Sequence, residues 1–377
     1  MPLGKEAQSF YKEITKIRFM PSIIGLPEML KNLNKKNKDL FNRFFSVQRS
    51  TGRLVLPESM KKWAENTFGH QNHVEEQVIV KILDKLVFEE ALYNELRAKR
   101  PIQAKENEDF EKIIKQSAGG PFSKPLQLTP EDMFGRIKGK HCVTASNVAK
   151  YDGMHGLVVF KKHNPLDFNQ EDLYDYFDTA LKWFEKAHKT NEKAIYPFLL
   201  WNCLWRSGAS IIHGHIQMVL GEGFHYGDVE KENKVRLEYH KKYKSDYFKD
   251  FFRIHKQIGL GFEEEGQQIF MNIVPREDKE VTIIAKKLDR NCVRAIYKIA
   301  KCLTDDFGVV SFNLGVVFPP LKKMQNWKDF PVIVRIVDRG KLSSKTTDIG
   351  GMEIYDMGNV ISTDPYKVFE KIKKSFA

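Results

Sequence analysis

Three polar side chains stand at every second position near the end of the stretch "SGASIIHGHIQ": His213, His215 and Gln217. Alternate residues of a β-strand share a face, so an extended chain here places all three on one side. A neutral imidazole is a competent nucleophile at pH 7 because it need not lose a proton first, provided that an acceptor holds its other ring nitrogen. Gln217 adds an amide donor that carries no charge to repel a phosphate.

Small residues precede this row, in the segment Ser207-Gly208-Ala209-Ser210. Such a segment lets a ligand approach the backbone closely, and its amides and hydroxyls can hold phosphate oxygens. Two histidines at this spacing also suit a metal ion, or a strand face turned to water. Spacing alone therefore does not decide whether these residues form a nucleophilic site, a metal site or a face turned to solvent.

Further polar residues stand where neighbouring strands end. His163 closes the expected strand "HGLVVFKKH", and Asn202 lies at the end of "YPFLLWNC". The sequence "TASN" places Ser146 and Asn147 on a turn after another strand. In an α+β unit these strands can lie beside the His213 strand, which would bring the polar residues to one site.

The order strand, helix, strand, strand occurs twice in the second part of the chain. In the first copy an amphipathic helix begins after Asn169, with Asp172 in its first turn. In the second copy a helix begins after Asp289 and ends near Gly308. The pattern predicts an internal duplication. Because Arg335 and aliphatic residues occupy the second copy where the first has histidines, we expect the chemical site in the first copy only.

The N-terminal part is expected to be mainly helical. Residues 75–100 carry Val78, Ile82, Leu86 and Phe88 at helical spacing. A stretch rich in Gly, Pro and Ser follows and is expected to form a long connection or a covering loop. The predicted domains are a helical region with its covering loop over 1–136, the active repeat over 137–262 and a degenerate repeat over 263–377.

Bulk composition is that of a globular protein. The 377 residues carry a formal charge of +12, and no apolar run approaches the ~20 residues of a membrane span. A charged N-terminus without a signal peptide's apolar core predicts a cytoplasmic location. Four scattered cysteines without a Cys-x-x-Cys pair predict no disulfides and small buried thiols. The basic surface can recruit anions, but no nucleic-acid-binding module is present.

Taken together, these residues resemble the histidine-triad superfamily, and in particular its galactose-1-phosphate uridylyltransferase-like nucleotidylyltransferase branch. The resemblance covers about residues 137–377. Its motifs are a Gly-Ala-Ser segment before His-x-His-x-Gln, an asparagine on the preceding strand, a histidine ending an earlier strand and a C-terminal "GGME". They match Gly208 to Ser210, His213, His215, Gln217, Asn202, His163 and Glu353, with Asn147 in the turn that contacts the nucleoside.

The resemblance implies an α+β fold of two tandem repeats with antiparallel sheets and packed helices. It implies that His215 attacks the α-phosphorus of a nucleotide sugar and carries a nucleoside monophosphate, UMP first of all, to a sugar 1-phosphate or phosphate. By the same resemblance Gln217 is catalytic, and the substrate is bound by Asn147, Asn202, Gly208, Ser210 and Glu353. The implied partners are a nucleotide sugar and a sugar phosphate or nucleotide, with no organic cofactor, no membrane and no nucleic acid, and a homodimer by analogy.

The chain also departs from the family pattern. Many members bind zinc through a Cys-x-x-Cys pair and the histidines that match His163 and His213, yet this chain lacks the cysteine pair. Zinc therefore stays an open expectation. Alternatives within the superfamily are a diadenosine polyphosphate phosphorylase (an ATP adenylyltransferase) and an ADP- or GDP-sugar phosphorylase. Glutamine at position 217 argues against a hydrolase. A non-catalytic nucleotide- or RNA-binding protein is the alternative from another class.

Overall fold

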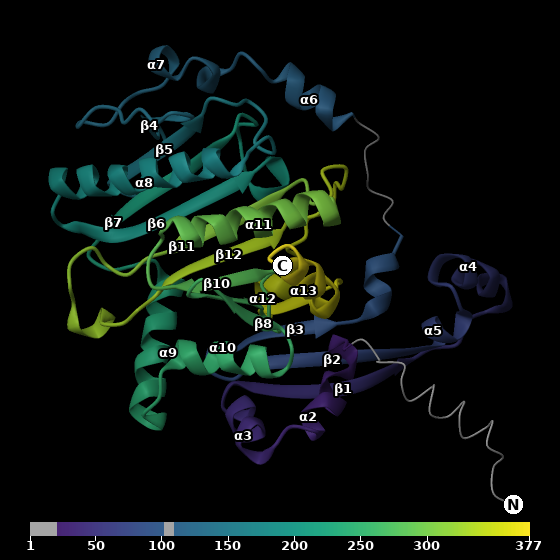
Figure 1. The fold of residues 1–377 in the computed structure, drawn as a ribbon. Helices are drawn as coiled ribbons and strands as arrows, with labels where there is room; N and C mark the ends of the chain where they lie inside the picture. The colour runs from purple at the N-terminus through teal and green to yellow at the C-terminus, as the bar shows by residue number, and fades with distance from the viewer. Residues whose placement is uncertain (1–20, 102–108) are drawn as a thin grey trace, which may run out of the picture.

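Nine antiparallel strands form one large sheet in the computed structural model, which describes residues 21–101 and 109–377 (Figure 1). In order across the sheet they are β4 (Cys142–Ser146), β5 (Met154–Phe160), β7 (His215–Glu222), β6 (Ala194–Cys203), β11 (Phe312–Val317), β12 (Val332–Asp338), β10 (Val281–Ala285), β9 (Gln267–Met271) and β8 (Gly261–Glu264). The mixed α+β class and the antiparallel pairing predicted from the sequence are confirmed.

The sheet has two halves that repeat the same order. The first half runs β5, α8 (Gln170–Thr190), β6 and β7, and the second runs β10, α11 (Arg290–Phe307), β11 and β12. The halves meet where β6 pairs with β11, with Asn202 opposite Asn313. The strand–helix–strand–strand order that indicated a duplication is therefore present in both halves. The predicted domain limits stay predictions, and β8 crosses the one placed after residue 262.

The two faces of the sheet have different characters. Helices α8 and α11 lie across one face (Figure 1), and α13 (Pro365–Lys374) packs against α11. Strand β7 turns Ile216, Met218 and Leu220 toward this helical layer, where they are fully buried. Because side chains alternate along a strand, His215 and Gln217 project from the opposite face. The helical layer thus supplies the core, and the other face is left for chemistry.

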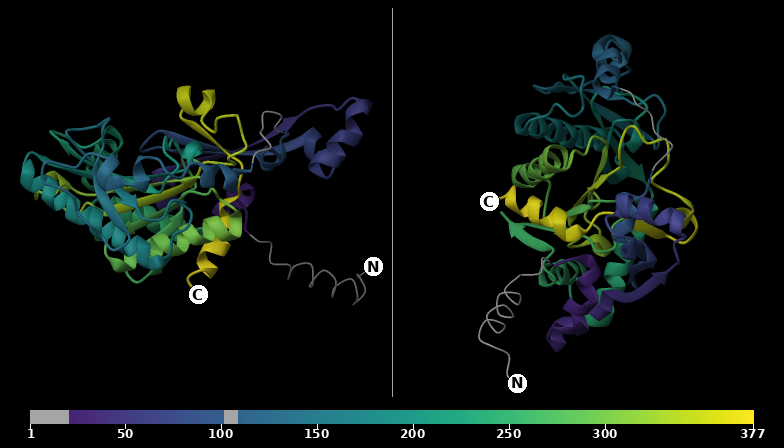
Figure 2. Two further views of the ribbon diagram at one scale, coloured as in Figure 1. Left: turned by 90° about the horizontal axis from the view of Figure 1, so that it is seen from above. Right: turned by 90° about the vertical axis from the view of Figure 1, so that its right-hand side faces the viewer.

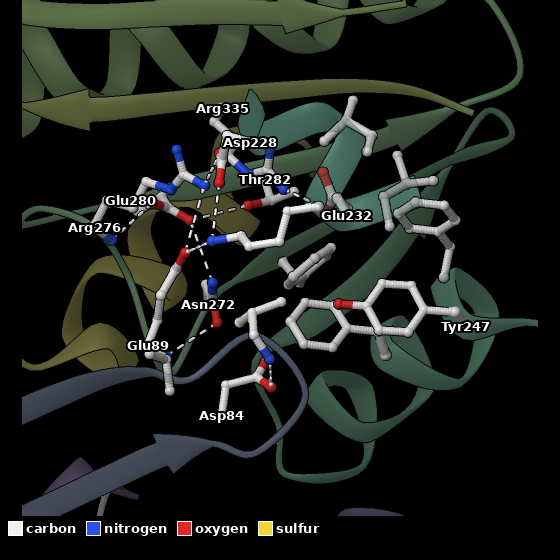
Figure 3. Close-up of a pocket in the computed structure, with 18 residues that line it drawn as sticks. Asp84, Glu89, Asp228, Glu232, Tyr247, Asn272, Arg276, Glu280, Thr282 and Arg335 are labelled. Carbon is white, nitrogen blue, oxygen red and sulfur yellow. Dashed lines mark hydrogen bonds and ion pairs between the residues drawn. The ribbon is translucent and has the colours of Figure 1, made fainter. Parts of the chain in front are cut away.

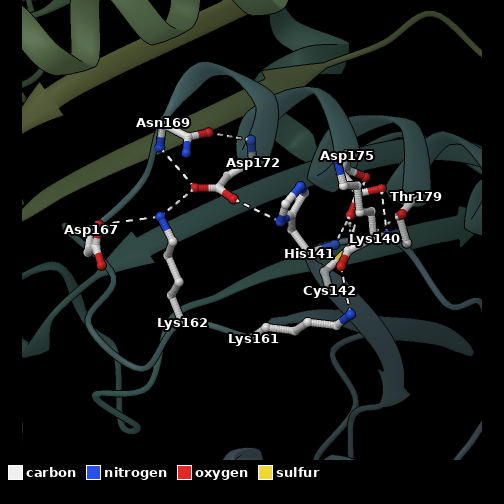
Figure 4. Close-up of polar contacts among 10 residues, drawn as sticks. All are labelled: Lys140, His141, Cys142, Lys161, Lys162, Asp167, Asn169, Asp172, Asp175 and Thr179. Atoms are coloured by element: carbon white, nitrogen blue, oxygen red, sulfur yellow. Dashed lines mark hydrogen bonds and ion pairs between the residues drawn. The ribbon is translucent and has the colours of Figure 1, made fainter.

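The start of α8 is tied to the strands beside it (Figure 4). Asn169 and Asp172 form the predicted cap as a full capping box. The Asp172 carboxylate also accepts from Lys162 Nζ at 2.9 Å. Asp175 accepts backbone N–H bonds from Lys140 and His141 at the entrance to β4. These contacts fix the loop between β5 and α8, which carries His163.

The N-terminal region contains a second, four-stranded sheet. Its order is β1 (Phe45–Arg53), β2 (Glu76–Asp84), β3 (Glu89–Tyr93) and β13 (Gly358–Ile361), the last one parallel to β3. The surrounding helices are α2 (Leu26–Lys31), α3 (Lys35–Phe44), α4 (Glu58–Phe68) and α5 (Gln71–Glu75). Helices α4 and α5 lie at the end of a β1–β2 arm that projects from the body (Figure 2).

The prediction of a helix over residues 75–100 is wrong, because strands β2 and β3 occupy this segment. The run from Val78 to Ile82 is rich in β-branched residues, which fit a pleated surface better than a helix. Pairing with β1 on one side and β3 on the other decides the outcome. Phe88, assigned to the apolar stripe, lies in the turn between the strands and is exposed.

The remaining helices lie around the large sheet. Helix α6 (Phe110–Gln116) and α7 (Pro125–Leu128) lie above β4 and β5 in Figure 1, and α9 (Gly227–Tyr243) and α10 (Tyr247–Gln257) lie beside the second half. Helix α12 (Gly351–Tyr355) is short. All four cysteines are buried and free, as predicted. In the described ranges, no helix is both long and apolar enough to cross a membrane.

Candidate active site

His215 is the first residue of strand β7, and one of its ring nitrogens is hydrogen-bonded to the backbone. Its Nδ1 lies 2.9 Å from the carbonyl oxygen of His213. A carbonyl only accepts, so Nδ1 carries the hydrogen and the lone pair is on Nε2. Within the described part of the chain nothing hydrogen-bonds to this Nε2, and it is not among the fully buried polar atoms that lack a partner. Burial lowers the pKa of His215 and keeps the ring neutral. The tautomer that the nucleophile prediction requires is present.

Gln217 lies two residues along on the same face, opposite Leu157 of β5. Its Oε1 accepts a hydrogen bond from His155 Nε2 at 3.0 Å. The amide nitrogen of Gln217 has no partner among the residues described, and it too is not fully buried. The free N–H groups therefore lie beside the free lone pair of His215, where a phosphate oxygen would find a donor.

Asn202 approaches the same place from β6. Leu200 pairs with Gln217, so extending that antiparallel register by two residues places Asn202 beside His215. The Asn202 Oδ1 accepts from Asn313 Nδ2 at 2.7 Å, and the Asn202 Nδ2 donor has no partner within residues 21–101 and 109–377. One face of the sheet thus presents an imidazole lone pair between two uncharged amide donors.

The turn between β6 and β7 is built from unusual backbone. Leu204 has φ +64° and Gly208 has φ +91°, both in the left-handed region. Glycine adopts such angles without strain, whereas leucine does so at a cost. The turn leaves Gly208 and Ser210 exposed, ahead of His213 and of β7. Their position fits the predicted phosphate-holding segment, and their roles stay predictions.

His163 and His213 face each other through their Nδ1 atoms at 3.1 Å. Each ring has its Nε2 close to a backbone carbonyl, Ile114 for His163 at 2.7 Å and Phe160 for His213 at 2.8 Å. With both Nε2 atoms as donors, the two Nδ1 lone pairs face one another. Burial lowers the pKa of His213, so the pair is a place where a cation would find two nitrogen ligands.

Two imidazoles alone do not make a zinc site. Structural zinc in proteins takes four ligands, and imidazole nitrogens on one tetrahedral ion lie roughly 3.3 Å apart. The separation fits two ligands, but no group of three or more His, Cys, Asp or Glu side chains in residues 21–101 and 109–377 is placed to hold a metal. The residues described therefore do not fit the family's zinc, and no step of the mechanism is assigned to it.

The two other predicted residues lie differently. Asn147 belongs to the turn after β4, and its amide nitrogen lies 3.1 Å from His155 Nε2, next to the Gln217 contact. Glu353 does not touch the histidine row. Its carboxylate accepts backbone N–H bonds from Gly350 at 2.7 Å and Val360 at 3.3 Å, so it caps α12. It faces the candidate site only across a cavity.

This cavity of about 340 Å³ opens beside Asn313 and is lined by Arg339, Glu277 and Glu353 among other polar residues. The Asn313 that borders the cavity is the residue that holds Asn202. Burial raises the pKa of Glu277 to about 8, with the charge of Asp348 adding to the effect. A hollow lined by polar groups next to the histidine face can receive the second end of a long ligand.

The segment that contains Ser117 and Phe122 lies over the histidines. The ring of Phe122 meets His215 edge-on at 5.1 Å and packs with Val143, Ala145, Leu157 and Val159. Ser117 Oγ, from the same segment, lies 3.0 Å from His163 Nε2. The segment expected to form a long connection or a covering loop thus packs over the histidines.

The sequence reading missed Phe122, His155, Asn313 and Arg339 as site residues. Phe122 lies in a short 3₁₀-helix, Arg339 follows β12, and His155 and Asn313 lie in strands. A polar residue within an apolar strand was the one available signal, and it applied to His155 and Asn313.

The corresponding face of the second half is filled with ion pairs (Figure 3). Arg335 stands where the first half has its histidines, and it bonds Glu232 at 2.8 Å. Arg276 pairs with Asp228, and Lys231 bonds Glu89 at 2.6 Å. Only about 50 Å³ of space remains on the Arg335 side of this network. On its other side Glu89, Asp228, Lys231 and Arg276 line the cavity beside Asn313, so the role of this half as scaffold and binding wall stays a prediction.

Comparison with solved structures supports the fold described above. No protein-family model and no curated protein matches the sequence. Solved structures do match. An ADP-glucose phosphorylase from Arabidopsis thaliana with bound ADP-glucose aligns at TM-score 0.59 and 14% identity, over 78% of this chain and 97% of that one.

Two further structures agree. A galt-like protein from Arabidopsis thaliana aligns at TM-score 0.55 and 15% identity, over 68% of this chain and 92% of that one. A uridylyltransferase aligns at TM-score 0.54 and 16% identity, over 80% of this chain and 98% of that one. At these identities the likeness establishes the fold alone. The chain therefore shares the fold of these three structures, which is the fold that the sequence resemblance implies.

Proposed function

We propose that this chain is a nucleotidylyltransferase that carries a nucleoside monophosphate on His215. The observation that carries the proposal is the bond from His215 Nδ1–H to the His213 carbonyl. It leaves a neutral imidazole with its lone pair on Nε2, flanked by the amide donors of Gln217 and Asn202. An unprotonated nucleophile next to uncharged donors is suited to attack an anionic phosphorus centre.

The reaction consists of two displacements. In the first, the Nε2 lone pair of His215 forms a bond to the α-phosphorus, and the bond from phosphorus to the bridging oxygen breaks. The electron pair leaves with a sugar 1-phosphate. In the second, a phosphate oxygen of the acceptor bonds to the same phosphorus, and the electron pair of the P–N bond returns to Nε2. The His213 carbonyl stabilises the ring's positive charge between the two steps through Nδ1–H.

The surrounding donors suit the charge that develops on phosphorus. Gln217 and Asn202 each offer an amide N–H on the His215 face that no described residue engages, and Ser210 and the backbone at Gly208 lie just ahead of it. Donors already fixed in place stabilise a transition state without reorganising, and removing one typically costs about 10²–10³ in rate. The cavity beside Asn313 is where we place the sugar or acceptor end, with Glu353 on its wall.

The first substrate we propose is a nucleotide sugar that donates UMP, with a sugar 1-phosphate as acceptor. A second candidate is an ADP-sugar phosphorylase, which uses inorganic phosphate as the acceptor. The alignment with the ADP-glucose phosphorylase, at TM-score 0.59, favours it. The chemistry at His215 is common to both, and the base and the acceptor distinguish them.

The test is covalent labelling. The purified chain is incubated with UDP-, ADP- and GDP-sugars and with a diadenosine polyphosphate, each carrying ³²P at the α-position. We expect one of them to leave a label on the protein that is acid-labile and alkali-stable, and His215→Ala to abolish it. If no donor labels the wild type, the proposal is wrong. The non-catalytic alternative predicts nucleotide or RNA binding that weakens with salt and survives His215→Ala.

A further inference from the structure

His155 is fully buried on β5, on the same sheet face as Gln217. Its ring is stacked against Tyr151, with centroids 4.6 Å apart and planes 26° apart. A buried imidazole needs partners for both nitrogens, since an unpaired polar group in the interior is costly. His155 has them, and they come from two different elements.

The partners determine which nitrogen of His155 carries hydrogen. The backbone N–H of Tyr151 donates to Nδ1 at 3.0 Å, so Nδ1 holds the lone pair. Burial lowers the pKa of His155, which keeps the ring neutral. A neutral ring with a lone pair on Nδ1 has its hydrogen on Nε2. This Nε2–H donates to Gln217 Oε1 at 3.0 Å. The amide nitrogen of Asn147 lies 3.1 Å from the same atom, but it is itself a donor and therefore makes no hydrogen bond to this N–H.

The hydrogen bond to Oε1 fixes the orientation of the Gln217 amide. An amide can rotate by 180° and exchange its oxygen and nitrogen, because the two ends are nearly equal in shape. With Oε1 held by His155, the N–H₂ end is turned to the free side, where it has no partner among the described residues. Rotated, the amide would present an oxygen lone pair to a phosphate oxygen and repel it.

The turn that follows β4 also holds His155 in position. Lys150 Nζ bonds the His155 carbonyl at 3.1 Å and Ser146 Oγ at 2.7 Å, and it precedes the Tyr151 amide in the chain. The turn that carries Asn147 is thereby connected to Gln217 through a single ring. A backbone donor, unlike a side chain, cannot change its polarity, so the direction of the whole chain of hydrogen bonds is set by Tyr151.

We infer that His155 is a positioning residue, which uses the Tyr151 amide to keep the Gln217 N–H₂ group directed at the transferred phosphoryl group. The inference rests on the proposed function of His215 and Gln217. His155 does not touch the substrate, and acts through Gln217. Residues that orient a reacting group in this way commonly cost about 10–100-fold in activity when they are replaced.

Three variants test the inference, with the rate and the final extent of ³²P labelling measured separately. His155→Met fills a similar volume without a donor, and we expect labelling 10–100-fold slower to the same final extent. His155→Gln places an amide N–H near the former Nε2 and should restore most of the rate. Gln217→Met combined with His155→Met should be no slower than Gln217→Met alone, since the two side chains act as one unit.

A matched control separates positioning from folding. His225 is also fully buried, accepts the Tyr226 backbone N–H on Nδ1 at 2.8 Å and bonds the Phe318 carbonyl through Nε2 at 3.2 Å, but it contacts none of the candidate site residues. His225→Met should lower the unfolding midpoint about as much as His155→Met while leaving the labelling rate unchanged.

Several outcomes would overturn the inference. They are equal slowing by both methionine variants, slowing by His155→Met that adds to that of Gln217→Met, and His155→Gln no faster than His155→Met when both are folded. If the wild type takes no label from any donor, the proposed function fails and this inference falls with it. A wild type that labels while His155→Met labels equally fast contradicts this inference alone.

Discussion

The Nδ1–H of His215 donates to the backbone carbonyl of His213, which lies two residues earlier in the bend that leads into β7. The nucleophile's tautomer is therefore fixed by the backbone just ahead of its own strand and not by a carboxylate partner. The alternation of the two histidines makes this bond local, and the face on which it occurs is the one that carries Gln217. The chemistry proposed here depends on that one bond.

Replacing His215 should remove the covalent step. We expect His215→Ala to take no acid-labile label, while nucleotide still binds, because Gln217, Asn202 and the Gly208 turn remain. Gln217→Ala should slow labelling about 10²–10³-fold, as is typical when one fixed donor is lost. Both variants should keep the wild-type unfolding midpoint to within a few degrees. Label that persists in His215→Ala would assign the nucleophile to another residue.

Removing the ring of Phe122 should expose His215. This ring packs edge-on against His215 and belongs to a small apolar cluster separate from the main core. A Phe→Ala change in a core costs about 3 kcal/mol, so losing half of that locally raises the open population about tenfold. The rate at which diethyl pyrocarbonate modifies His215, followed by mass spectrometry, should rise accordingly.

The exposed Leu126 of the same segment provides the control for Phe122. Leu126→Ala removes apolar surface without removing a contact to His215, so the modification rate should not change. If Phe122→Ala also leaves the rate unchanged, the segment from 110 to 128 does not cover the histidine in solution.

The His163–His213 pair should hold no stoichiometric zinc. Two imidazoles are the only suitable ligands that the described residues bring together there. We expect elemental analysis of the purified protein to give far less than one zinc per chain, and a chelator to leave the unfolding midpoint unchanged. One zinc per chain, lost in both His163→Ala and His213→Ala, would mean that a further ligand completes the site.

The parts of the fold and site that could be predicted are those encoded locally. The α8 cap at Asn169, the alternation of His215 and Gln217 and the repeated element order all depend on residues close in sequence. The expected strand begins later than predicted, because His213 lies in a bend ahead of β7. Strand β2 was misassigned because apolar residues at Val78 and Ile82 satisfy a helical stripe as well as a strand. Its pairing with β1, which sequence spacing does not reveal, decided the structure.

The missed site residues share a different cause. His155 meets Gln217 across 62 residues, and Asn313 meets Asn202 across 111. Neither residue lies in a motif of its own, so each acquires its role only through strand pairing. Long-range register is set by the packing of the whole sheet. A local reading therefore identifies the nucleophile but not the residues that orient its neighbours.

Breaking the Arg335–Glu232 pair should destabilise the protein without touching its chemistry. Both side chains are largely buried, and Arg335→Met leaves the Glu232 carboxylate without its cation. Removing one partner of a buried pair typically costs about 3–5 kcal/mol. We expect a loss of that order in urea unfolding, partly recovered in the double variant with Glu232→Met, and labelling kinetics as in the wild type.

The exposed pair of Arg53 and Glu76 is the matched comparison. Surface ion pairs contribute at most about 1 kcal/mol, so Arg53→Met should barely change the unfolding curve. Slower labelling in Arg335→Met, at temperatures where it is fully folded, would show that the second half takes part in catalysis.

Glu277 should make the stability of the protein fall as the pH rises. Burial raises its pKa to about 8 in the folded protein, whereas an unfolded glutamate titrates near about 4.3. Between those values the folded state holds a proton that the unfolded state has lost, so the free energy of unfolding decreases with increasing pH and levels off above about pH 8. Glu277→Gln cannot ionise. Its unfolding midpoint should therefore match the wild type near pH 4.5, exceed it increasingly up to pH 8 and stay higher by a constant amount above that.

The exposed Glu192→Gln should show no such divergence. Parallel curves for Glu277→Gln and wild type across this range would mean that Glu277 is ionised in the folded protein and that the cavity beside Asn313 is wetter than its lining indicates.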